Sequence, residues 1–460
     1  MRLPALRPAP AFLALSLVFG AAFLAVTPPL EAPDEGRHLM RAFLIAEGTF
    51  LAERIPGEVA SVEVPRSLLE MKARLAPTAA RREGRPHDPA LLRAELYEPL
   101  APEDRVRIAL PSLYSPLPYL PQALGVALGR ALGAPPVAFV WLGRALNLAF
   151  YAGCVFTALR IAPAHGLAFA LLALTPMALF EASSLAADGP ANALAFLFAG
   201  AVLRAADPRR PSVAAREMAL LAVLASALAL TKQAYAPLAA AVLAVPPARF
   251  RSRRAWLAGV AGVTGAAALA AGLWFAALRG LELPKLTYAS DPAGQLRFLA
   301  EHPLEALAVP IRTALPRIGV WLRTFVGVLG SLDVPLPGAV YAIHPLVLLA
   351  VAALDGRGSP VRGVGRLALL GVAAATALAV LLLAYVGWTR PGDTVVRHVQ
   401  GRYFIPLAPF VAAALHLPRA QRAPAGARAA ALAWSAAVLG LSVLALVDHY
   451  WSAAARLPSH

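Results

Sequence analysis

The sequence predicts an all-α protein that crosses a membrane many times. Of its 460 residues, 59% are hydrophobic and only 15% are charged, whereas about a quarter of the residues in soluble domains are charged. Apolar runs recur from Ala11 to the C-terminus, each near the ~20 residues that a helix needs to cross the hydrocarbon layer. The segment "LLAVLASALAL" shows none of the alternation that marks barrel strands, so we expect the spans to be helices.

The excess of basic residues does not indicate a nucleic-acid partner. The 42 Lys and Arg residues against 26 Asp and Glu residues give a net charge of +16, and the basic residues gather in the short connections between apolar runs. The positive-inside rule expects this distribution, and no basic stripe with interleaved aromatic residues is present. The single cysteine, Cys154, lies in an apolar run, which excludes an internal disulfide and a cysteine metal site and favours a packing role.

The first segment, residues 1–27, is expected to be a retained membrane anchor. Arg2 and Arg7 precede its apolar run and are expected in the cytoplasm. Pro28 and Pro29 stand where a signal peptide would need small residues for cleavage. The chain that follows is therefore expected on the outer face of the membrane.

Residues 28–136 are expected to form the first extracytoplasmic loop. Two of its stretches, "PRSLLEMKARL" and "DPALLRAEL", have the spacing of short amphipathic helices that lie against the membrane surface. The apolar segment 116–132 is short and contains several prolines. It is therefore expected to be an interfacial or re-entrant helix and not a full span.

The arginine-rich connections set the order of the remaining segments. Residues 137–278 are expected to hold transmembrane helices 2–7, residues 279–337 a second extracytoplasmic loop with membrane-skimming helices, and residues 338–460 the C-terminal transmembrane helices. The count is about eleven spans, with the N-terminus in the cytoplasm and the C-terminus outside. The predicted spans are 11–26, 137–159, 163–182, 189–204, 217–231, 235–248, 255–278, 338–354, 366–388, 404–417 and 428–449.

This topology brings the polar clusters that are not arginine-rich to the outer face. Ionisable groups at membrane depth are expensive and usually mark a functional cavity, so their convergence indicates a site on that face. The clusters are Asp34 to Arg41, Asp188, Lys232 with Gln233, the loop 279–337, and Asp393 to Tyr403.

The stretch "PDEGRHLMRA" is the first of these clusters. Pro33 can begin a short helix with Asp34 and Glu35 in its first turn. Helical spacing then places a carboxylate, His38 and Arg41 on one face. Such a group can act as a general base or hold a divalent ion. A capped interfacial helix explains the same residues, so both interpretations stay open.

The later clusters also have two interpretations. Asp188 can cap the next helix, and Lys232 can extend from a helix end toward water. In "VQGRYFIPLAPF", Gly401 permits an unusual backbone angle. Arg402 and Tyr403 form either an aromatic belt with an arginine anchor or a phosphate clamp. The sequence contains no Walker A motif, nucleophile elbow, HExxH or nucleotide-binding GxGxxG unit, so nucleotide chemistry in the cytoplasm is not expected.

Several blocks resemble one family in order along the chain. The stretch "PPLEAPDEGRHLMRAFLIAEG" resembles the first-loop signature of the bacterial membrane proteins that share domain of unknown function 2142 (DUF2142). The blocks "SSLAADGPANALAFL", "TKQAYAPL", "FVGVLGSLDVPLP" and "QGRYFIPLAPF" resemble later parts of that family. The likeness extends over about residues 10 to 450.

This family looks like a branch of the GT-C glycosyltransferases, multi-pass enzymes that take sugars from polyprenyl-phosphate carriers on the outer leaflet. The resemblance implies a GT-C-like bundle in the bacterial inner membrane, with Asp34 and Glu35 in the position of the catalytic carboxylate. It also implies a metal or substrate contact for Asp188 and a lipid-phosphate contact for Arg402. The other candidates for substrate or phosphate binding are His38, Arg41, Lys232, Gln400 and Tyr403.

The function that the resemblance implies is transfer of a sugar from a polyprenyl-phosphate donor to a glycan, lipid or protein acceptor of the cell envelope. One carboxylate would take the proton of the acceptor hydroxyl, and Arg402 with Lys232 or Arg41 would stabilise the departing phosphate. The expected partners are the lipid-linked sugar, membrane lipids and the acceptor. The competing interpretations are a flippase or transporter and a non-catalytic component of polysaccharide assembly. A divalent cation, Mg²⁺ or Mn²⁺, is an optional cofactor, with the ligands Asp34, His38 and Asp188.

Overall fold

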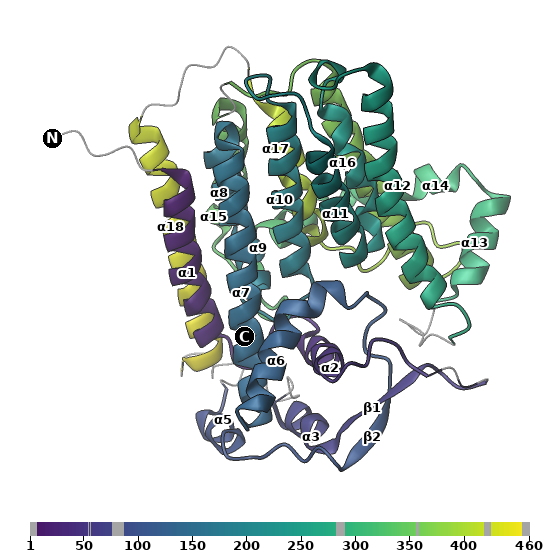
Figure 1. The fold of residues 1–460 in the computed structure, drawn as a ribbon. Helices are drawn as coiled ribbons and strands as arrows, with labels where there is room; N and C mark the ends of the chain where they lie inside the picture. The colour runs from purple at the N-terminus through teal and green to yellow at the C-terminus, as the bar shows by residue number, and fades with distance from the viewer. Residues whose placement is uncertain are drawn as a thin grey trace.

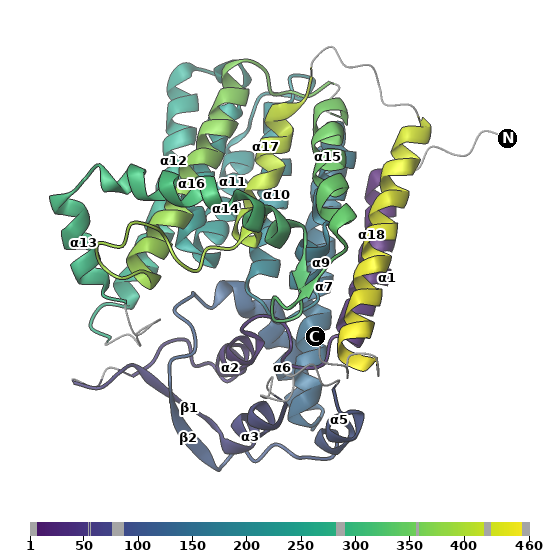
Figure 2. The same ribbon diagram turned by 180° about the vertical axis from the view of Figure 1, so that it is seen from behind.

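The computed structural model shows a bundle of apolar helices with a smaller mixed layer at one end (Figures 1 and 2). It describes residues 7–53, 55, 57–75, 87–281, 290–355, 358–417 and 425–452. The long helices run side by side along one direction, and the layer is built by the segment between α1 and α7.

Within the described residues, seven helices have the length and apolar composition to cross a membrane. They are α1 (Pro8–Val26), α7 (Pro136–Ile161), α10 (Asp188–Ala206), α12 (Arg253–Ala277), α15 (Gly338–Asp355), α16 (Val364–Trp388) and α18 (Ala425–Trp451). The predicted class, a helical protein with several membrane spans, is confirmed.

An eighth span results if two helices on either side of a break are counted together. The 3-10 helix η2 (Pro163–His165) leads into α8 (Gly166–Ala173), and α9 (Pro176–Ala182) follows after a bend of 79°. Pro176 has no amide proton with which to continue the hydrogen-bond ladder of α8, which accounts for the break. Every residue of α9 is buried, so the bend carries this helix into the interior.

The predicted count of about eleven spans is not confirmed. The predicted spans 217–231, 235–248 and 404–417 correspond to elements that are shorter than a full membrane span. These are α11 (Ala215–Thr231), the 3-10 helix η3 (Gln233–Ala244), and the 3-10 helix η5 (Gly401–Leu407) with α17 (Ala408–Leu415). Pro237 and Pro406 lie inside the two 3-10 helices and remove backbone donors there. A short 3-10 helix, η4 (Pro247–Arg249), precedes α12.

The layer contains short helices and one pair of strands. Its elements are α2 (Glu35–Ala46), β1 (Ser61–Pro65), α3 (Arg66–Leu75), α5 (Pro89–Glu95), β2 (Arg105–Ala109), η1 (Leu117–Tyr119) and α6 (Leu120–Ala131). The two predicted amphipathic helices are observed as α3 and α5. The antiparallel ladder, in which Ser61 pairs with Ala109 and Pro65 with Arg105, was not predicted.

The layer has its own hydrophobic core, which joins it to the start of α7. Phe43 of α2, Leu68 of α3 and Phe139 of α7 are buried together there. The 12-residue helix α6 is short for a span, in agreement with the expectation for segment 116–132. A Cβ added at Gly125 of α6 would lie 2.6 Å from the backbone nitrogen of Gly143. Glycine is therefore required where α6 crosses α7.

The described part of the predicted second loop also contains short elements. These are α13 (Pro292–Glu301), α14 (Glu305–Val326), β3 (Val328–Leu329) and β4 (Val334–Pro335). α14 runs across the side of the bundle (Figure 2). It exposes Leu307, Ile311, Leu315 and Ile318 at helical spacing. This is the apolar stripe that a membrane-skimming helix requires.

The fold predicts which connections lie on opposite sides of the membrane. Ala187 packs against Ile45 and Tyr119 of the layer, and α10 then extends for 19 residues, or about 28 Å. In a Cys154→Ala background, Asp104→Cys in the layer and Arg209→Cys in the α10–α11 connection should react with a membrane-impermeant maleimide from opposite sides. Reaction of both cysteines from the same side would contradict this arrangement.

Candidate functional site

A buried arginine in α7 joins the first helix, the layer and the bundle. The side chains of Arg144 and Glu35 have no exposed surface. Nε and Nη2 of Arg144 donate to Oε1 and Oε2 of Glu35 at 2.8 and 2.6 Å, the two-point contact that guanidinium and carboxylate groups favour. Nη1 and Nη2 also donate to the carbonyls of Thr27 and Pro28 at 2.6 and 2.9 Å. Arg144 therefore holds the chain where it leaves α1.

The carboxylate oxygens of Glu35 also accept hydrogen bonds from two backbone amides. Oε1 accepts from Leu185 N at 3.1 Å and Oε2 from Ala32 N at 3.4 Å. Burial alone would raise the pKa of the Glu35 carboxyl. The charge of Arg144, its hydrogen bonds and those of the two amides have the larger combined effect, so the pKa is lowered from its ordinary value. Because both oxygens are engaged, the neighbouring Asp34 is the better candidate for a catalytic base.

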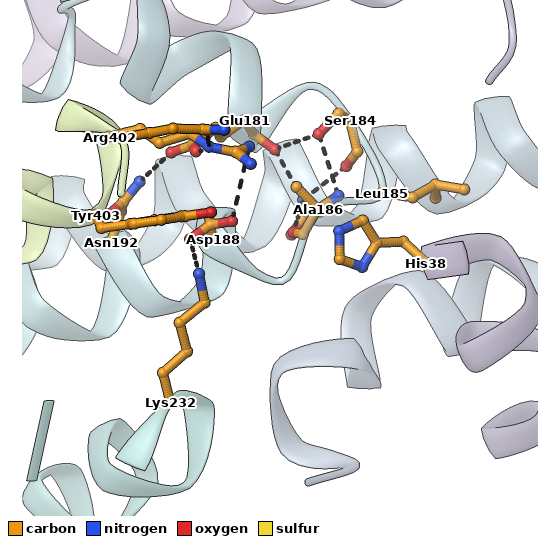
Figure 3. Close-up of polar contacts among 12 residues, drawn as sticks. His38, Glu181, Ser184, Leu185, Ala186, Asp188, Asn192, Lys232, Arg402 and Tyr403 are labelled. Atoms are coloured by element: carbon orange, nitrogen blue, oxygen red, sulfur yellow. Dashed lines mark hydrogen bonds and ion pairs between the residues drawn. The ribbon is translucent and has the colours of Figure 1, made fainter. Parts of the chain in front are cut away.

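Amide side chains of neighbouring helices hold the turn between α9 and α10. Asn147 of α7 donates from Nδ2 to the Ser184 carbonyl at 2.7 Å, and Gln122 of α6 donates from Nε2 to the Ala186 carbonyl at 3.2 Å. Together with the bond from Leu185 N to Glu35, these contacts position the turn from α2, α6 and α7. The segment expected as an outer connection is thus a buried element of the site (Figure 3).

Four charged side chains meet beside this turn and form a buried charge cluster: Glu181, Asp188, Lys232 and Arg402 (Figure 3). Asp188, the first residue of α10, pairs with Lys232. Nη1 of Arg402 lies 4.0 Å from Asp188 Oδ2 and 3.5 Å from Glu181 Oε1. The other oxygen of Glu181 accepts from Asn192 Nδ2 at 2.9 Å. Each cation of the cluster therefore has an acidic partner, as buried charges require.

Aromatic rings surround the Lys232 ammonium. Its Nζ lies 4.6 Å from the ring centre of Tyr403 and 5.4 Å from that of Tyr114, distances at which a ring face attracts a cation. The Tyr235 hydroxyl donates to the Tyr403 carbonyl at 3.1 Å. Lys232 is therefore held inside the protein and does not extend to water.

Close packing against α14 places Arg402. A Cβ at Gly401 would lie only 1.7 Å from the Trp321 carbonyl oxygen, and Gly401 N donates to Thr324 Oγ1 at 2.7 Å. Gly401 does not have a positive φ, so its role is close approach and not the unusual backbone angle that we expected. Arg402 Nε then donates to Gln400 Oε1 at 2.6 Å.

The cluster contains polar atoms whose hydrogen-bonding capacity is not used. Among the described residues, Arg402 Nη1 and Glu181 Oε1 form no hydrogen bond, although both atoms are buried. Leaving a buried donor without an acceptor is costly, and more so for a charged group. A ligand with an anionic oxygen would satisfy Arg402 Nη1.

His38 of α2 approaches the cluster from the layer (Figure 3). Its Nδ1 lies 3.0 Å from the Tyr119 hydroxyl, which donates to Ser112 Oγ at 3.1 Å. Burial lowers the pKa of His38 from 6.5 to about 4, although the charges of Asp188 and Asp34 oppose the change. The imidazole is therefore neutral at physiological pH.

Asp34 has an unusual backbone and an exposed side chain. Its φ is 56° and its ψ is 14°, a left-handed conformation that is uncommon for residues other than glycine. It precedes α2, but its side chain forms no capping hydrogen bond. The capped-helix interpretation therefore does not account for Asp34. Strained backbone of this kind is often found at functional sites.

Arg41 supports the layer. Its Nη2 donates to the carbonyls of Phe50 and Tyr114 at 2.8 and 3.2 Å. It thus fixes the segment that carries Tyr114 toward Lys232. Nε and Nη1 of Arg41 are buried and form no hydrogen bond with the described residues.

The donor set around Asp188 does not fit a divalent ion. In the described part of the chain, no group of three or more His, Cys, Asp or Glu side chains is arranged to hold a metal. The Asp188 carboxylate faces Lys232 and Arg402, which already supply positive charge. The arrangement suits a phosphate group better than Mg²⁺ or Mn²⁺.

The structure brings most of the predicted candidates together at the end of the bundle that the layer covers. Glu181 and Arg144 were not identified from the sequence. Both are ionisable residues within apolar segments, and this is the signal that could have revealed them. The candidates within or in direct contact with the cluster are Asp188, Lys232, Gln400, Arg402 and Tyr403. His38 lies beside the cluster. Glu35 and Arg41 hold the segments that surround it.

Removal of one member of the Glu35–Arg144 pair should destabilise the protein strongly. Glu35→Ala leaves a buried guanidinium without its counter-ion and should lower the free energy of unfolding by about 3–5 kcal/mol. The double variant Glu35→Ala, Arg144→Met should recover part of this loss. The free energy of unfolding is measured on the purified proteins in detergent. Glu58→Ala, which removes an exposed carboxylate, is the control and should cost less than about 1 kcal/mol. Wild-type stability of Glu35→Ala would refute the assigned role.

Stability should depend on pH through His38. Because folding lowers the His38 pKa from 6.5 to about 4, the unfolded chain takes up this proton at a higher pH than the folded chain. The contribution of His38 to the free energy of unfolding is constant above pH 6.5, and this stability is lost as the pH falls from 6.5 toward 4. His38→Gln should reduce the slope of unfolding free energy against pH in that window. Equal slopes in the two proteins would show that His38 is not buried in its neutral form.

Residues 17–411 match the model of a family described as predicted membrane protein (DUF2142). No curated protein and no solved structure matches the chain. The family match spans well over half of the 460 residues, in agreement with the sequence blocks that resemble this family. The chain therefore belongs to the DUF2142 family of predicted membrane proteins.

Proposed function

We propose that the protein is a membrane glycosyltransferase of the GT-C type, which transfers a sugar from a polyprenyl-phosphate donor to a cell-envelope acceptor on the extracytoplasmic face. The observation that carries this proposal is the buried charge cluster, in which Arg402 Nη1 forms no hydrogen bond with the described residues. A buried arginine with an unused donor, at the end of an apolar bundle, suits a phosphate that is attached to a membrane-embedded chain.

The two cations are suited to different parts of the phosphate. Arg402 presents a planar set of donors that can bind two phosphate oxygens, and Lys232 acts as a compact positive charge. The rings of Tyr114 and Tyr403 lie over the Lys232 ammonium, and Lys232 is buried. In this low-dielectric setting, fixed positive charge stabilises the developing charge of the departing phosphate more than it would in water.

The proposed reaction has one substitution step. Asp34 takes the proton from the acceptor hydroxyl while the hydroxyl oxygen attacks the anomeric carbon. The bond between that carbon and the phosphate oxygen breaks, and its electron pair leaves with polyprenyl phosphate, which Arg402 and Lys232 bind. Glu35 holds the turn through Leu185 and is not consumed in this step. His38, neutral and close to both Asp34 and Asp188, positions the acceptor.

The proposal assigns the base and the acceptor site to the layer. α2 carries Asp34 at its start and His38 one turn later, and the Glu35–Arg144 pair fastens that helix to α7. The donor's isoprenoid tail stays in the bilayer while its sugar phosphate enters beneath the layer. No nucleotide-activated sugar has to be exported in such a scheme.

Transfer of labelled sugar from a polyprenyl phosphate by the purified protein tests the proposal. Asp34→Asn should reduce the rate by about 10²–10⁴-fold. Arg402→Gln should reduce it by about 10²-fold or more, because the departing phosphate loses a charged donor.

Glu58→Asn removes a carboxylate from the same layer and should leave transfer unchanged, since that side chain is exposed and pairs only with Arg107 among the described residues. Unchanged transfer in Asp34→Asn would remove the assignment of the base. Movement of the lipid-linked sugar across the bilayer without transfer would replace the transferase proposal with a flippase.

A further inference from the structure

A cavity of 340 Å³ lies in the layer, apart from the buried charge cluster. Arg37 and Met40 of α2, Leu69 and Lys72 of α3, and the segment 108–113 line it. Its volume falls within the range of small-ligand pockets, roughly 300–1,000 Å³. The cavity therefore has room for a small molecule and not only for an ion.

The cavity carries positive charge, and no acid that compensates it lies among the described residues of its lining. None of those lining residues is Asp or Glu. Within the described residues, the side chains of Arg37 and Lys72 form neither an ion pair nor a hydrogen bond. Other arginines of the same layer are paired with carboxylates, namely Arg66, Arg74, Arg105 and Arg107. The two cations of the cavity are thus left available to a ligand.

Packing keeps these two cations close together. The stem of Lys72 crosses α2 at Gly36, where an added Cβ would lie 2.9 Å from Lys72 Cε and 3.3 Å from Cδ. Burial and, second to it, the charge of Arg37 lower the pKa of the Lys72 ammonium. Because the like charges repel each other, an anion between them would stabilise both.

We propose that this cavity binds a phosphate ester through Arg37 and Lys72. The guanidinium supplies paired donors and the ammonium a compact charge, which together match the charge of a phosphate monoester. Met40, Leu69 and Ile108 form an apolar wall for the group that carries the phosphate. The same chemistry is found in an anionic lipid head group and in a soluble phosphate ester.

Hydrogen bonds connect the cavity with the buried charge cluster. Ser112 lines the cavity and accepts from the Tyr119 hydroxyl, which lies 3.0 Å from His38 Nδ1. A ligand beside Ser112 is therefore two hydrogen bonds from His38. Binding at the cavity does not depend on the proposed sugar transfer, and each can fail without the other.

Direct binding to the full chain in phosphatidylcholine nanodiscs tests the proposal, with glycerol 3-phosphate as the soluble probe. Arg37→Gln and Lys72→Gln should each weaken binding by about tenfold, the size expected for loss of one charged hydrogen bond. The double variant should show no binding. Ala109→Trp fills the cavity from an exposed strand position without a change of charge, and it should also prevent binding.

Arg107→Gln is the matched control, because it removes an exposed layer charge that is paired with Glu58, and it should bind as the wild type does. A second arm compares the thermal unfolding midpoint in phosphatidylcholine nanodiscs with and without phosphatidic acid, a lipid whose head group is a phosphate monoester. A rise that requires both Arg37 and Lys72 identifies the ligand as a lipid head group. The proposal is overturned if neither probe gives a signal, or if the double variant or Ala109→Trp keeps wild-type binding.

Discussion

The ion pair between Arg144 and Glu35 is the constraint on which the arrangement of the other elements depends. Arg144 lies in α7, a helix of membrane-spanning length, where a lone guanidinium would be very costly. Its donors are satisfied by Glu35 and by the carbonyls of Thr27 and Pro28, so the start of α2 is held against the bundle. Glu35 in turn receives the Leu185 amide. This interaction therefore also positions the buried turn between α9 and α10, and with it Asp188 at the start of α10.

The four side chains of the buried charge cluster stabilise one another, so the loss of any one of them is expected to destabilise the protein. Replacing buried ion pairs with apolar residues often leaves stability unchanged or improves it, whereas removing one partner is strongly destabilising. Stability alone therefore does not explain why two carboxylates, a lysine and an arginine are gathered there. Their position beneath the layer, the aromatic rings around Lys232 and the unused capacity of Arg402 favour a site for an anionic substrate. The Arg37–Lys72 cavity would extend phosphate recognition into the layer itself.

Many residues of the site are recognisable in the sequence, but their partners are not. Asp188, Lys232 and Arg402 are recognisable because each is ionisable and borders an apolar run. The adjacent residues Asp34 and Glu35 are equivalent candidates in the sequence, and burial separates them. One is exposed with a left-handed backbone, whereas the other has no exposed side-chain surface and is bound to Arg144. Glu181 was not among the predicted site residues because it lies inside a segment that hydropathy assigns to a membrane span.

By itself, the sequence determined that the protein is helical and membrane-spanning, that the first loop contains amphipathic helices, and that the chain resembles the DUF2142 family. Hydropathy and helical periodicity are properties of neighbouring residues, so they can be read without the fold. Only the tertiary structure decided the bend before α9, the 3-10 geometry of η3 and η5, and the partners of each buried charge. Glu35 meets an arginine 109 positions away and an amide 150 positions away. Such contacts depend on how helices pack, which no local pattern specifies.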